Sequence, residues 1–216
     1  MPSLFLVLED NPEMAENNCR FLQQIEPEAR CLWESKPEAV TSRLAMEQPD
    51  LLVIDLLFGD TQGHLSAQPG LDCLADICER YQHLNVLVYT AEPTFLNPLV
   101  ARIQHHRGGL VVVNKLERRD VFVSGAKSAL EGKHMLPREL NQVKSLTDIE
   151  QQVLKLMCVD CLADRAIAER MHIALRTAQN HIRSLKQKLA PEALDDDEKN
   201  ARMAVCHVAY RDRWLV

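Results

Sequence analysis

The sequence predicts an α/β domain followed by a small all-α domain. We expect a five-stranded, doubly wound parallel sheet over residues 1–130, a linker over 131–145, and four helices over 146–216. Three observations lead to this order. Short apolar runs alternate with amphipathic stretches up to residue 130, a polar segment containing Pro137 follows, and beyond it apolar residues recur only at helical spacing.

The strands of the first domain are expected from one weak and four strong apolar runs. The strong runs span 5–8, 51–54, 86–89 and 110–113, and the weaker run spans 29–33. Uninterrupted Val, Leu and Ile are typical of parallel strands that are covered on both faces.

Helix signals separate these strands. Asn11 and Pro12 form a cap and a first helical position, and Ser35 with Glu38 has the spacing of a capping box. Apolar residues at helical spacing predict helices over about 12–25, from Ser35 onward, and over about 71–81, 95–106 and 120–130. Five strand–helix units predict helices on both faces of the sheet, because the crossovers are right-handed.

Polar residues follow four of the strands where each strand ends. They are Glu9, Asp10, Asp55, Thr90 and Lys115. Parallel strands end at one edge of a sheet, which is where α/β proteins bind ligands. Three carboxylates there repel one another unless a hard cation joins them, and few side-chain oxygens suit Mg²⁺ better than Ca²⁺. With the metal present, one aspartate can attack a phosphoryl donor, while Thr90 and Lys115 bind the phosphoryl oxygens.

These five positions resemble a bacterial response-regulator receiver domain, which has a flavodoxin-like fold, over about residues 4–130. The resemblance implies that Glu9 and Asp10 are the acidic pair that holds Mg²⁺ together with Asp55, the phosphoacceptor. Thr90 and Lys115 then match the switch hydroxyl and the lysine of the family, and a cognate histidine kinase is the implied partner.

Besides Phe58 and Gly59, which stand where the family usually has Met-Pro, two departures of the first domain from the receiver pattern concern its function. Extra residues, 64–69, follow the phosphoacceptor, and Val112 stands where the family places an aromatic switch residue. The first departure is consistent with a tolerated surface loop, and also with altered partner choice. Val112 makes transfer of the switch mechanism less secure than transfer of the phosphorylation site.

The second domain begins with a capping box, Thr147 and Glu150, and continues with helices over about 149–157, 164–171, 176–189 and 199–213. A tight turn at 172–175 before the third of these helices is what a helix-turn-helix needs. On that helix Gln179, Asn180 and Arg183 project together. Amides pair with adenine and guanidinium groups with guanine. Arg176, Thr177, Lys186 and Lys188 flank them and suit phosphates.

These residues resemble the LuxR-type helix-turn-helix of NarL/FixJ response regulators over about 146–212. The resemblance implies that Gln179, Asn180 and Arg183 read bases in double-stranded DNA, and that a homodimer forms through the receiver domain, the last helix or both. Ala163 and Ala174 stand where serine usually caps two helices. Because the loss of a serine cap costs about 1 kcal/mol of helix stability, we expect modest affinity for DNA.

Charge, hydropathy and cysteine content narrow the class of protein further. All of the net charge of −6 lies in residues 1–145, because residues 146–216 hold 11 basic and 11 acidic residues. No apolar run approaches the length of a bilayer span, and the first residues lack the pattern of a signal peptide, so we expect a cytoplasmic protein without membrane contact. Seven scattered cysteines make a disulfide framework unexpected, and the Cys158–Cys161 pair is interpreted as thiols of a helical core.

The expected function is therefore a phosphorylation-dependent transcription regulator rather than an enzyme. One alternative keeps the DNA-binding half and makes the first domain a non-phosphorylated dimerisation or ligand-sensing module. Another is an aspartate-nucleophile phosphohydrolase, which normally carries a second aspartate where this chain has Leu57. The sequence does not identify the kinase, the stimulus, the target promoters or the sign of regulation.

Overall fold

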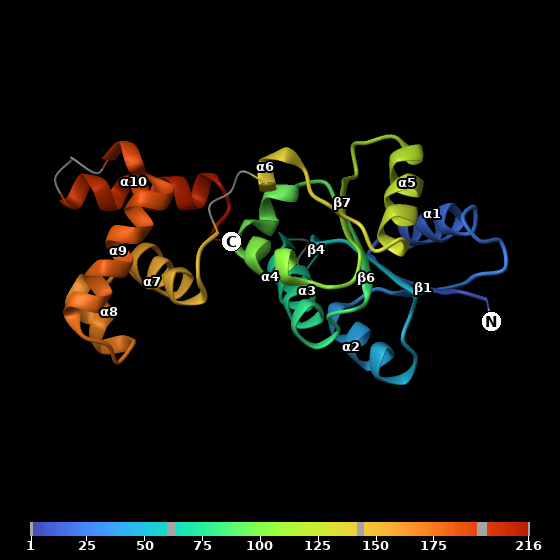
Figure 1. Ribbon diagram of the computed structural model, residues 1–216, viewed down its shortest axis with the longest axis horizontal. Helices are drawn as coiled ribbons and strands as arrows, with labels where there is room; N and C mark the ends of the chain where they lie inside the picture. Colours follow the sequence, from blue (N-terminus) through green and yellow to red (C-terminus); the bar gives the residue numbers. More distant parts are fainter. Residues whose placement is uncertain (1, 60–63, 142–144, 194–197, 216) are drawn as a thin grey trace. The chain divides into compact units, whose positions relative to one another are not determined.

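A computed structural model describes residues 2–59, 64–141, 145–193 and 198–215 (Figure 1). The chain divides into two compact units, residues 1–141 and residues 142–216, and each is described by itself. This division differs from the expected boundary at residue 130. Residues 131–141 belong to the first unit, because they add a strand and a helical turn to it.

The first unit is built on a parallel sheet with the strand order β2-β1-β3-β6-β7-β8. The expected parallel sheet is confirmed, and its five strands gain a short sixth one. The strands are β1 (Leu4–Leu8), β2 (Arg30–Glu34), β3 (Leu51–Ile54), β6 (Asn85–Thr90), β7 (Leu110–Asn114) and β8 (His134–Met135). The sixth was missed because EGKHMLP has no apolar run.

Helices cover both faces of this sheet (Figure 1). Alternate residues of each strand point to opposite faces, so neighbours such as Phe5 and Leu6 belong to different apolar clusters. One cluster includes residues of α1 (Pro12–Leu22) and α5 (Arg119–Leu130). The other includes residues of α2 (Pro37–Met46), α3 (Gln68–Arg80) and α4 (Val100–His105).

Two helix starts differ from the sequence expectation. The helix expected over 95–106 begins as a 3₁₀ segment, η1 (Pro93–Leu99), before it becomes α4. Pro98 lies inside η1 and lacks the N–H that a regular α-helix would use. The capping box expected at Ser35 and Glu38 is absent, because Lys36 is the residue that precedes α2 and its side chain makes no cap hydrogen bond.

The extra residues after Asp55 form ordered structure. Leu65–Ser66 (β5) pairs antiparallel with Phe58–Gly59 (β4), and Pro69 lies in the first turn of α3. The segment 64–69 is therefore one strand of a hairpin and a helix start rather than a simple loop insertion.

The second unit is a cluster of short helices. They are α7 (Asp148–Cys158), α8 (Asp164–Arg170), α9 (Leu175–Leu189), η2 (Pro191–Ala193) and α10 (Glu198–Arg211). The Thr147–Glu150 capping box is present at the start of α7. Trp214 folds back into the apolar core, where its backbone N–H donates to the Ala209 carbonyl at 2.8 Å. His172 has a positive φ of 54°, which makes the turn that leads into α9 possible.

Two disulfides correct the expectation that the cysteines are unpaired. Cys19 of α1 is bonded to Cys31 of β2, and Cys158 of α7 is bonded to Cys206 of α10. Sequence separations of 12 and 48 residues do not indicate which cysteines pair. The sulfurs meet only because α1 packs on β2 and α7 packs against α10 in the folded chain. The Cys158–Cys161 pair is accordingly one bonded cysteine and one exposed thiol.

None of the helices in the described part of the chain is long and apolar enough to cross a lipid bilayer.

Candidate functional site

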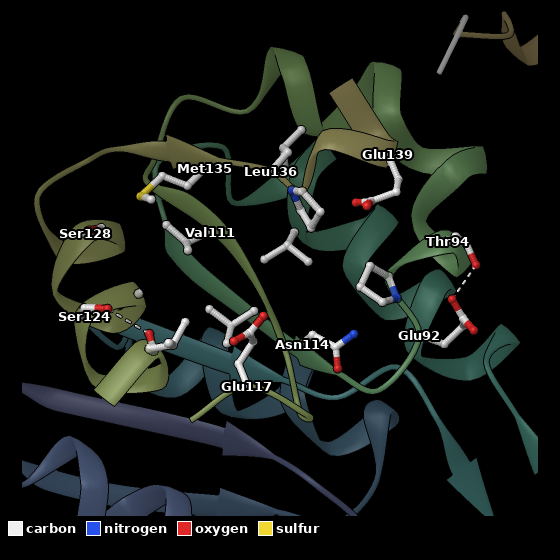
Figure 2. A pocket seen from close by; sticks show the side chains of 16 residues that line it. Glu92, Thr94, Val111, Asn114, Glu117, Ser124, Ser128, Met135, Leu136 and Glu139 are labelled. Carbon is white, nitrogen blue, oxygen red and sulfur yellow. Dashed lines mark hydrogen bonds between the residues drawn. The ribbon is translucent and has the colours of Figure 1, made fainter. Parts of the chain in front are cut away.

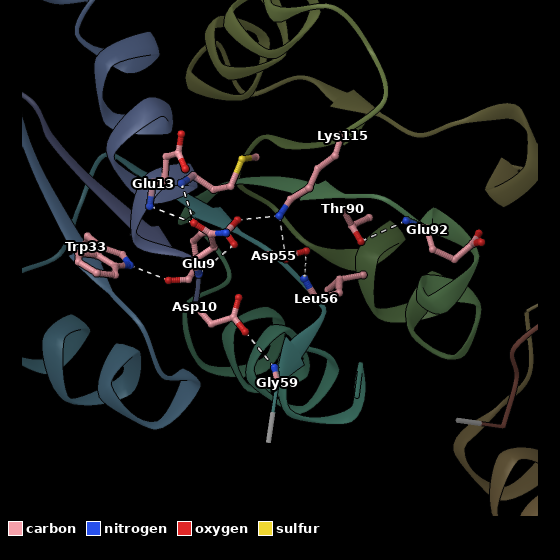
Figure 3. Close-up of polar contacts among 12 residues, drawn as sticks. Glu9, Asp10, Glu13, Trp33, Asp55, Leu56, Gly59, Thr90, Glu92 and Lys115 are labelled. Atoms are coloured by element: carbon pink, nitrogen blue, oxygen red, sulfur yellow. Dashed lines mark hydrogen bonds and ion pairs between the residues drawn. The ribbon is translucent and has the colours of Figure 1, made fainter. Parts of the chain in front are cut away.

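The ends of neighbouring strands bring the expected site residues of the first unit together (Figure 3). Glu9 and Asp10 follow β1, Asp55 follows β3, Thr90 ends β6 and Lys115 follows β7. These four strands are adjacent in the sheet and run parallel, so their carboxyl ends form one edge. The sheet order therefore provides the convergence that the sequence suggested.

Lys115 lies between two of the acids. Its Nζ donates to Oε2 of Glu9 at 2.6 Å and to Oδ2 of Asp55 at 2.8 Å. Glu9 is 2% exposed and Asp55 is 6% exposed. Two buried carboxylates thus share a single ammonium group, and Asp10 adds a third negative charge beside them.

The acids have a geometry that fits a small divalent cation. One oxygen each from Glu9, Asp10 and Asp55 lies within 4.8 Å of the other two. Three carboxylate oxygens, with coordination positions left for water and phosphate, match the preference of Mg²⁺. The donor set therefore fits the metal that the sequence analysis expected.

Burial and charge act on the protonation of this cluster in opposite senses. Loss of hydration raises the pKa of Glu9, and the nearby Asp55 charge adds to this effect, while hydrogen bonding and attraction from Lys115 oppose it. Burial tends to lower the pKa of Lys115, but the charges of Asp55 and Glu9 outweigh it and raise that pKa. The lysine is therefore firmly protonated, while the acids remain short of compensating charge.

Thr90 is fully buried at the end of the neighbouring strand, and its Oγ1 accepts a hydrogen bond from the backbone N–H of Glu92 at 3.4 Å. Figure 3 draws its side chain next to the Asp55 carboxylate, on the side away from Asp10. The hydroxyl still has its own proton to donate, as a group that binds a phosphoryl oxygen must.

Sequence reasoning missed two backbone donors and one side-chain donor that hold the acids. The Gly59 N–H of β4 donates to Oδ2 of Asp10 at 2.9 Å, and the Leu56 N–H donates to Oδ1 of Asp55 at 2.7 Å. Nε1 of Trp33 donates to the Glu9 carbonyl at 2.6 Å. No residue-type pattern signals these contacts, so only the folded arrangement reveals them.

In the second unit the expected DNA-reading residues lie together on the exposed side of α9. Arg176, Thr177, Gln179, Asn180 and Arg183 are all exposed. The opposite side of the helix is buried through Ala178, Ile182 and Leu185. Among the described residues, none of the five exposed side chains has a hydrogen-bond partner, so their donors are free for another molecule.

The two flanking lysines differ from this pattern. Lys186 is half-buried at the edge of the face. Nζ of Lys188 donates to Oε2 of Glu150 at 2.7 Å and to the Ser145 carbonyl at 3.1 Å. Lys188 is therefore engaged within the domain, in contrast to the phosphate contact that the sequence suggested.

Comparisons with known proteins agree with both halves of this description. Residues 144–194 match the family described as bacterial regulatory proteins, luxR family. The chain is 24% identical over 205 residues to the DNA-binding transcriptional activator DevR/DosR of Mycobacterium tuberculosis, covering 89% of this chain and 90% of that protein.

Solved structures with the same fold extend over nearly the whole chain. RcsB of Salmonella typhimurium is 17% identical with a TM-score of 0.58, over 96% of this chain and 99% of that one. The response regulator RcsB in a DNA complex is 18% identical with a TM-score of 0.56, over 97% and 98%. The fold of both units, in this order, is therefore that of these two-domain regulators.

Proposed function

We propose that this chain, a response regulator of the NarL/FixJ type, regulates transcription through phosphorylation of Asp55. Asp55 would accept a phosphoryl group from a histidine kinase, and the LuxR-type domain would bind double-stranded DNA through α9. The observation that carries the proposal is the environment of Asp55. Its buried carboxylate lies 2.8 Å from the Lys115 ammonium and beside the carboxylates of Glu9 and Asp10.

The chemistry of transfer follows from these groups. An Asp55 oxygen forms a bond to phosphorus while the bond from phosphorus to the donor's imidazole nitrogen breaks, and that nitrogen keeps the electron pair. Lys115 and Thr90 can donate hydrogen bonds to the new phosphoryl oxygens. A bound Mg²⁺, held by Glu9, Asp10 and Asp55, supplies positive charge that stabilises the transferring group.

DNA binding is proposed for the exposed face of α9. Gln179, Asn180 and Arg183 would contact base edges in the major groove, while Arg176, Thr177 and Lys186 would contact phosphates. Two observations support this assignment. The side chains of the exposed members of the set bond to no side chain or backbone group in the described part of the chain, and residues 144–194 match the luxR family. Lys188 is left out, because Glu150 already neutralises it.

A homodimer would present two such helices to paired half-sites. Met203, His207 and Tyr210 form an exposed stripe on α10 at helical spacing, and Met203 is 63% exposed. A helix that exposes a methionine and a tyrosine in one stripe suits contact with a second copy. One solved structure of similar fold contains RcsB dimers bound to DNA.

Phosphorylation is tested with Asp55→Asn. Incubation with acetyl phosphate and Mg²⁺ is expected to label the wild-type chain and to leave the variant unlabelled, because an amide cannot act as the nucleophile. Mass spectrometry of the intact protein measures the label. Asp76→Asn is the matched control, because Asp76 lies in α3 and is paired with Arg80 rather than with Lys115. Equal labelling of Asp55→Asn and wild type would refute the assignment.

Magnesium-dependent binding of beryllofluoride separates this proposal from a non-phosphorylated module. We expect binding by the wild type and by Asp76→Asn, and none by Asp55→Asn. Steady hydrolysis of a phosphomonoester would instead favour the phosphohydrolase.

DNA recognition is tested with Arg183→Ala and Lys186→Ala. We expect Arg183→Ala to lose about 5- to 150-fold of discrimination at one base position, because a bidentate contact contributes about 1–3 kcal/mol. Lys186→Ala is expected to weaken binding to all sequences and to reduce the salt dependence. Selection from a random DNA pool measures both. An unchanged consensus for Arg183→Ala would contradict its role in base reading.

A further inference from the structure

A pocket of about 510 Å³ lies beside β7 in the first unit (Figure 2). Its volume falls in the range of sites for small organic molecules. β7, the start of η1, α5 and the segment that follows β8 all contribute to its walls. Its apolar surface comes mainly from Val111, Val112, Val113, Val121, Met135 and Leu136.

An open strand edge forms part of this pocket. β8 pairs with β7 only at Leu110 and Val111, and Pro137 cannot extend the pairing because it has no N–H. The Leu110 N–H donates toward β8, to the Lys133 carbonyl at 3.0 Å. Backbone groups alternate along a strand, so the Val112 carbonyl also points to this side, where β8 has already ended. The pocket thus offers a backbone acceptor next to its apolar surface.

The charged residues of the pocket all carry the same sign. Glu92, Glu117 and Glu139 line it, and no lysine, arginine or histidine is among its described lining residues. Glu92 accepts a hydrogen bond from the Thr94 hydroxyl at 2.7 Å. Glu117 and Glu139 are exposed, and Figure 2 draws the Glu139 carboxylate turned toward the pocket. A ligand that complements these groups carries positive charge and hydrogen-bond donors.

We propose that this pocket binds a small organic ammonium compound. Its hydrocarbon body lies on the valines of β7, and its ammonium group is attracted by the acidic lining, to which Glu117, Glu139 and the Val112 carbonyl contribute. An ammonium has three donors and no acceptor, which matches the carboxylates and the Val112 carbonyl among the lining groups. A hydrocarbon without the charge would leave these acceptors unpaired.

The pocket lies close in sequence to the proposed phosphorylation site, although none of the residues proposed for phosphoryl transfer is among its described lining residues. Glu92 lies two residues after Thr90, and Asn114, which also lines the pocket, precedes Lys115. Glu139 lies in α6 (Arg138–Asn141), just before the second unit begins in the sequence. A bound amine therefore contacts sequence neighbours of Thr90 and Lys115 and the segment that leads to the second unit. Ligand binding here is an input separate from the kinase.

The test measures binding to the isotope-labelled full chain by NMR, without phosphodonor or DNA. Three hydrocarbon bodies (phenylbutyl, cyclohexylpropyl and hexyl) are each offered as the amine, the alcohol and the carboxylate. We expect amines to shift the amide signals of Val112, Asn114 and Gly125 and to bind about tenfold more tightly than the matching alcohols. Carboxylates are expected not to bind.

Charge variants locate the ammonium. Glu117→Gln with Glu139→Gln is expected to weaken amine binding about tenfold while alcohol binding stays unchanged, because exposed ion pairs each contribute a few-fold. Both residues are exposed, so the fold is not at risk. Glu79→Gln, an exposed change on α3, is the control and is expected to have no effect.

Three results would overturn the proposal. Alcohols that bind as tightly as amines would leave only an apolar pocket. Pocket signals that no amine shifts would exclude the site for this class of ligand. Signals that shift with protein concentration alone would show that a second copy of the chain, and not a small molecule, covers the pocket. Failure of phosphorylation at Asp55 would leave all of these readouts intact.

Discussion

Each unit contains a buried glutamate hydrogen-bonded to a lysine, and the two pairs behave in opposite ways. In the first unit Lys115 serves both Glu9 and Asp55, with Asp10 beside them. Burial raises the pKa of Glu9 there. In the second unit Lys188 and Ser184 both donate to Glu150, and the Thr147 backbone adds a third hydrogen bond. These contacts outweigh burial and lower the pKa of Glu150 to about 2.

The difference separates a site from a structural contact. At Glu150 every carboxylate oxygen has a donor and the charge is balanced, so the pair fixes the start of α7 and leaves nothing for a ligand. Around Lys115 three acids meet one base, and the excess negative charge is stabilised only when a cation arrives. A surplus of like charge, rather than burial of charge in itself, marks the functional cluster.

The largest effect that tests this comparison is expected for Glu150→Gln. The glutamine amide would have to place its NH₂ group against a donor, either Ser184 or Lys188. We therefore expect the second unit to lose about 2–3 kcal/mol of unfolding free energy at neutral pH. Urea unfolding followed by Trp214 fluorescence in a Trp33→Phe background measures it, because these are the two tryptophans of the chain. Glu9→Gln is the matched change and is expected to cost less than about 1 kcal/mol, because burial disfavours the charged form of Glu9 and the amide removes one of the like charges around Lys115.

The same pair predicts a pH dependence with a definite sign. The pKa of Glu150 is about 2 in the folded state and near 4.5 ordinarily, so its contribution is complete above the ordinary value. This contribution to the unfolding free energy is lost as pH falls from about 4.5 toward 2. The corresponding dependence of the unfolding free energy on pH should be absent in Glu150→Gln. A steeper acid dependence in the variant than in wild type would reverse the interpretation of this pair.

A smaller effect is expected for Lys115→Met at the first cluster. Removing the ammonium leaves three carboxylates without a base, so Mg²⁺ is expected to bind about tenfold more tightly although phosphoryl uptake falls. Isothermal titration of Mg²⁺ measures the affinity. Lys127→Met, an exposed change on α5, is the control. Weaker Mg²⁺ binding by Lys115→Met would mean that the lysine supports the metal rather than competing with it.

The smallest effect concerns the start of α9, which lacks a side-chain cap such as the one that Thr147 provides for α7. Ala174 precedes α9 and makes no side-chain cap hydrogen bond. Ala174→Ser is expected to stabilise the second unit by about 0.5–1 kcal/mol, because its hydroxyl can accept from a free backbone N–H. Thermal unfolding measures the gain. Ala174→Val, which enlarges the side chain without adding an acceptor, should give none.

The sequence was most informative where local chemistry repeats. Apolar runs located the five long strands, and the polar residues at their ends converge in the folded unit because parallel strands share an edge. Asn11 and the Thr147–Glu150 box cap α1 and α7 as their spacing suggested. Ser35 failed as a cap although its spacing was equally good, because Lys36 occupies the cap position.

Contacts between distant segments could not be predicted. The two disulfides, the donors to Asp10 and Glu9, and the pairing of Lys188 with Glu150 each depend on packing between different elements. β8 and α6 lie in a segment that has the composition of a linker, and they form because the edge of β7 and the cluster around Leu140 are available to them.

The sequence alone determined the order of strands and helices, the acids that gather at one edge and the polar face of α9. Each of these depends on residue type and on spacing within one element. The tertiary structure alone decided which charges are compensated, which cysteines are bonded and that a pocket opens beside β7. Those properties depend on which side chains from separate elements come within bonding distance, and one-dimensional spacing does not contain that information.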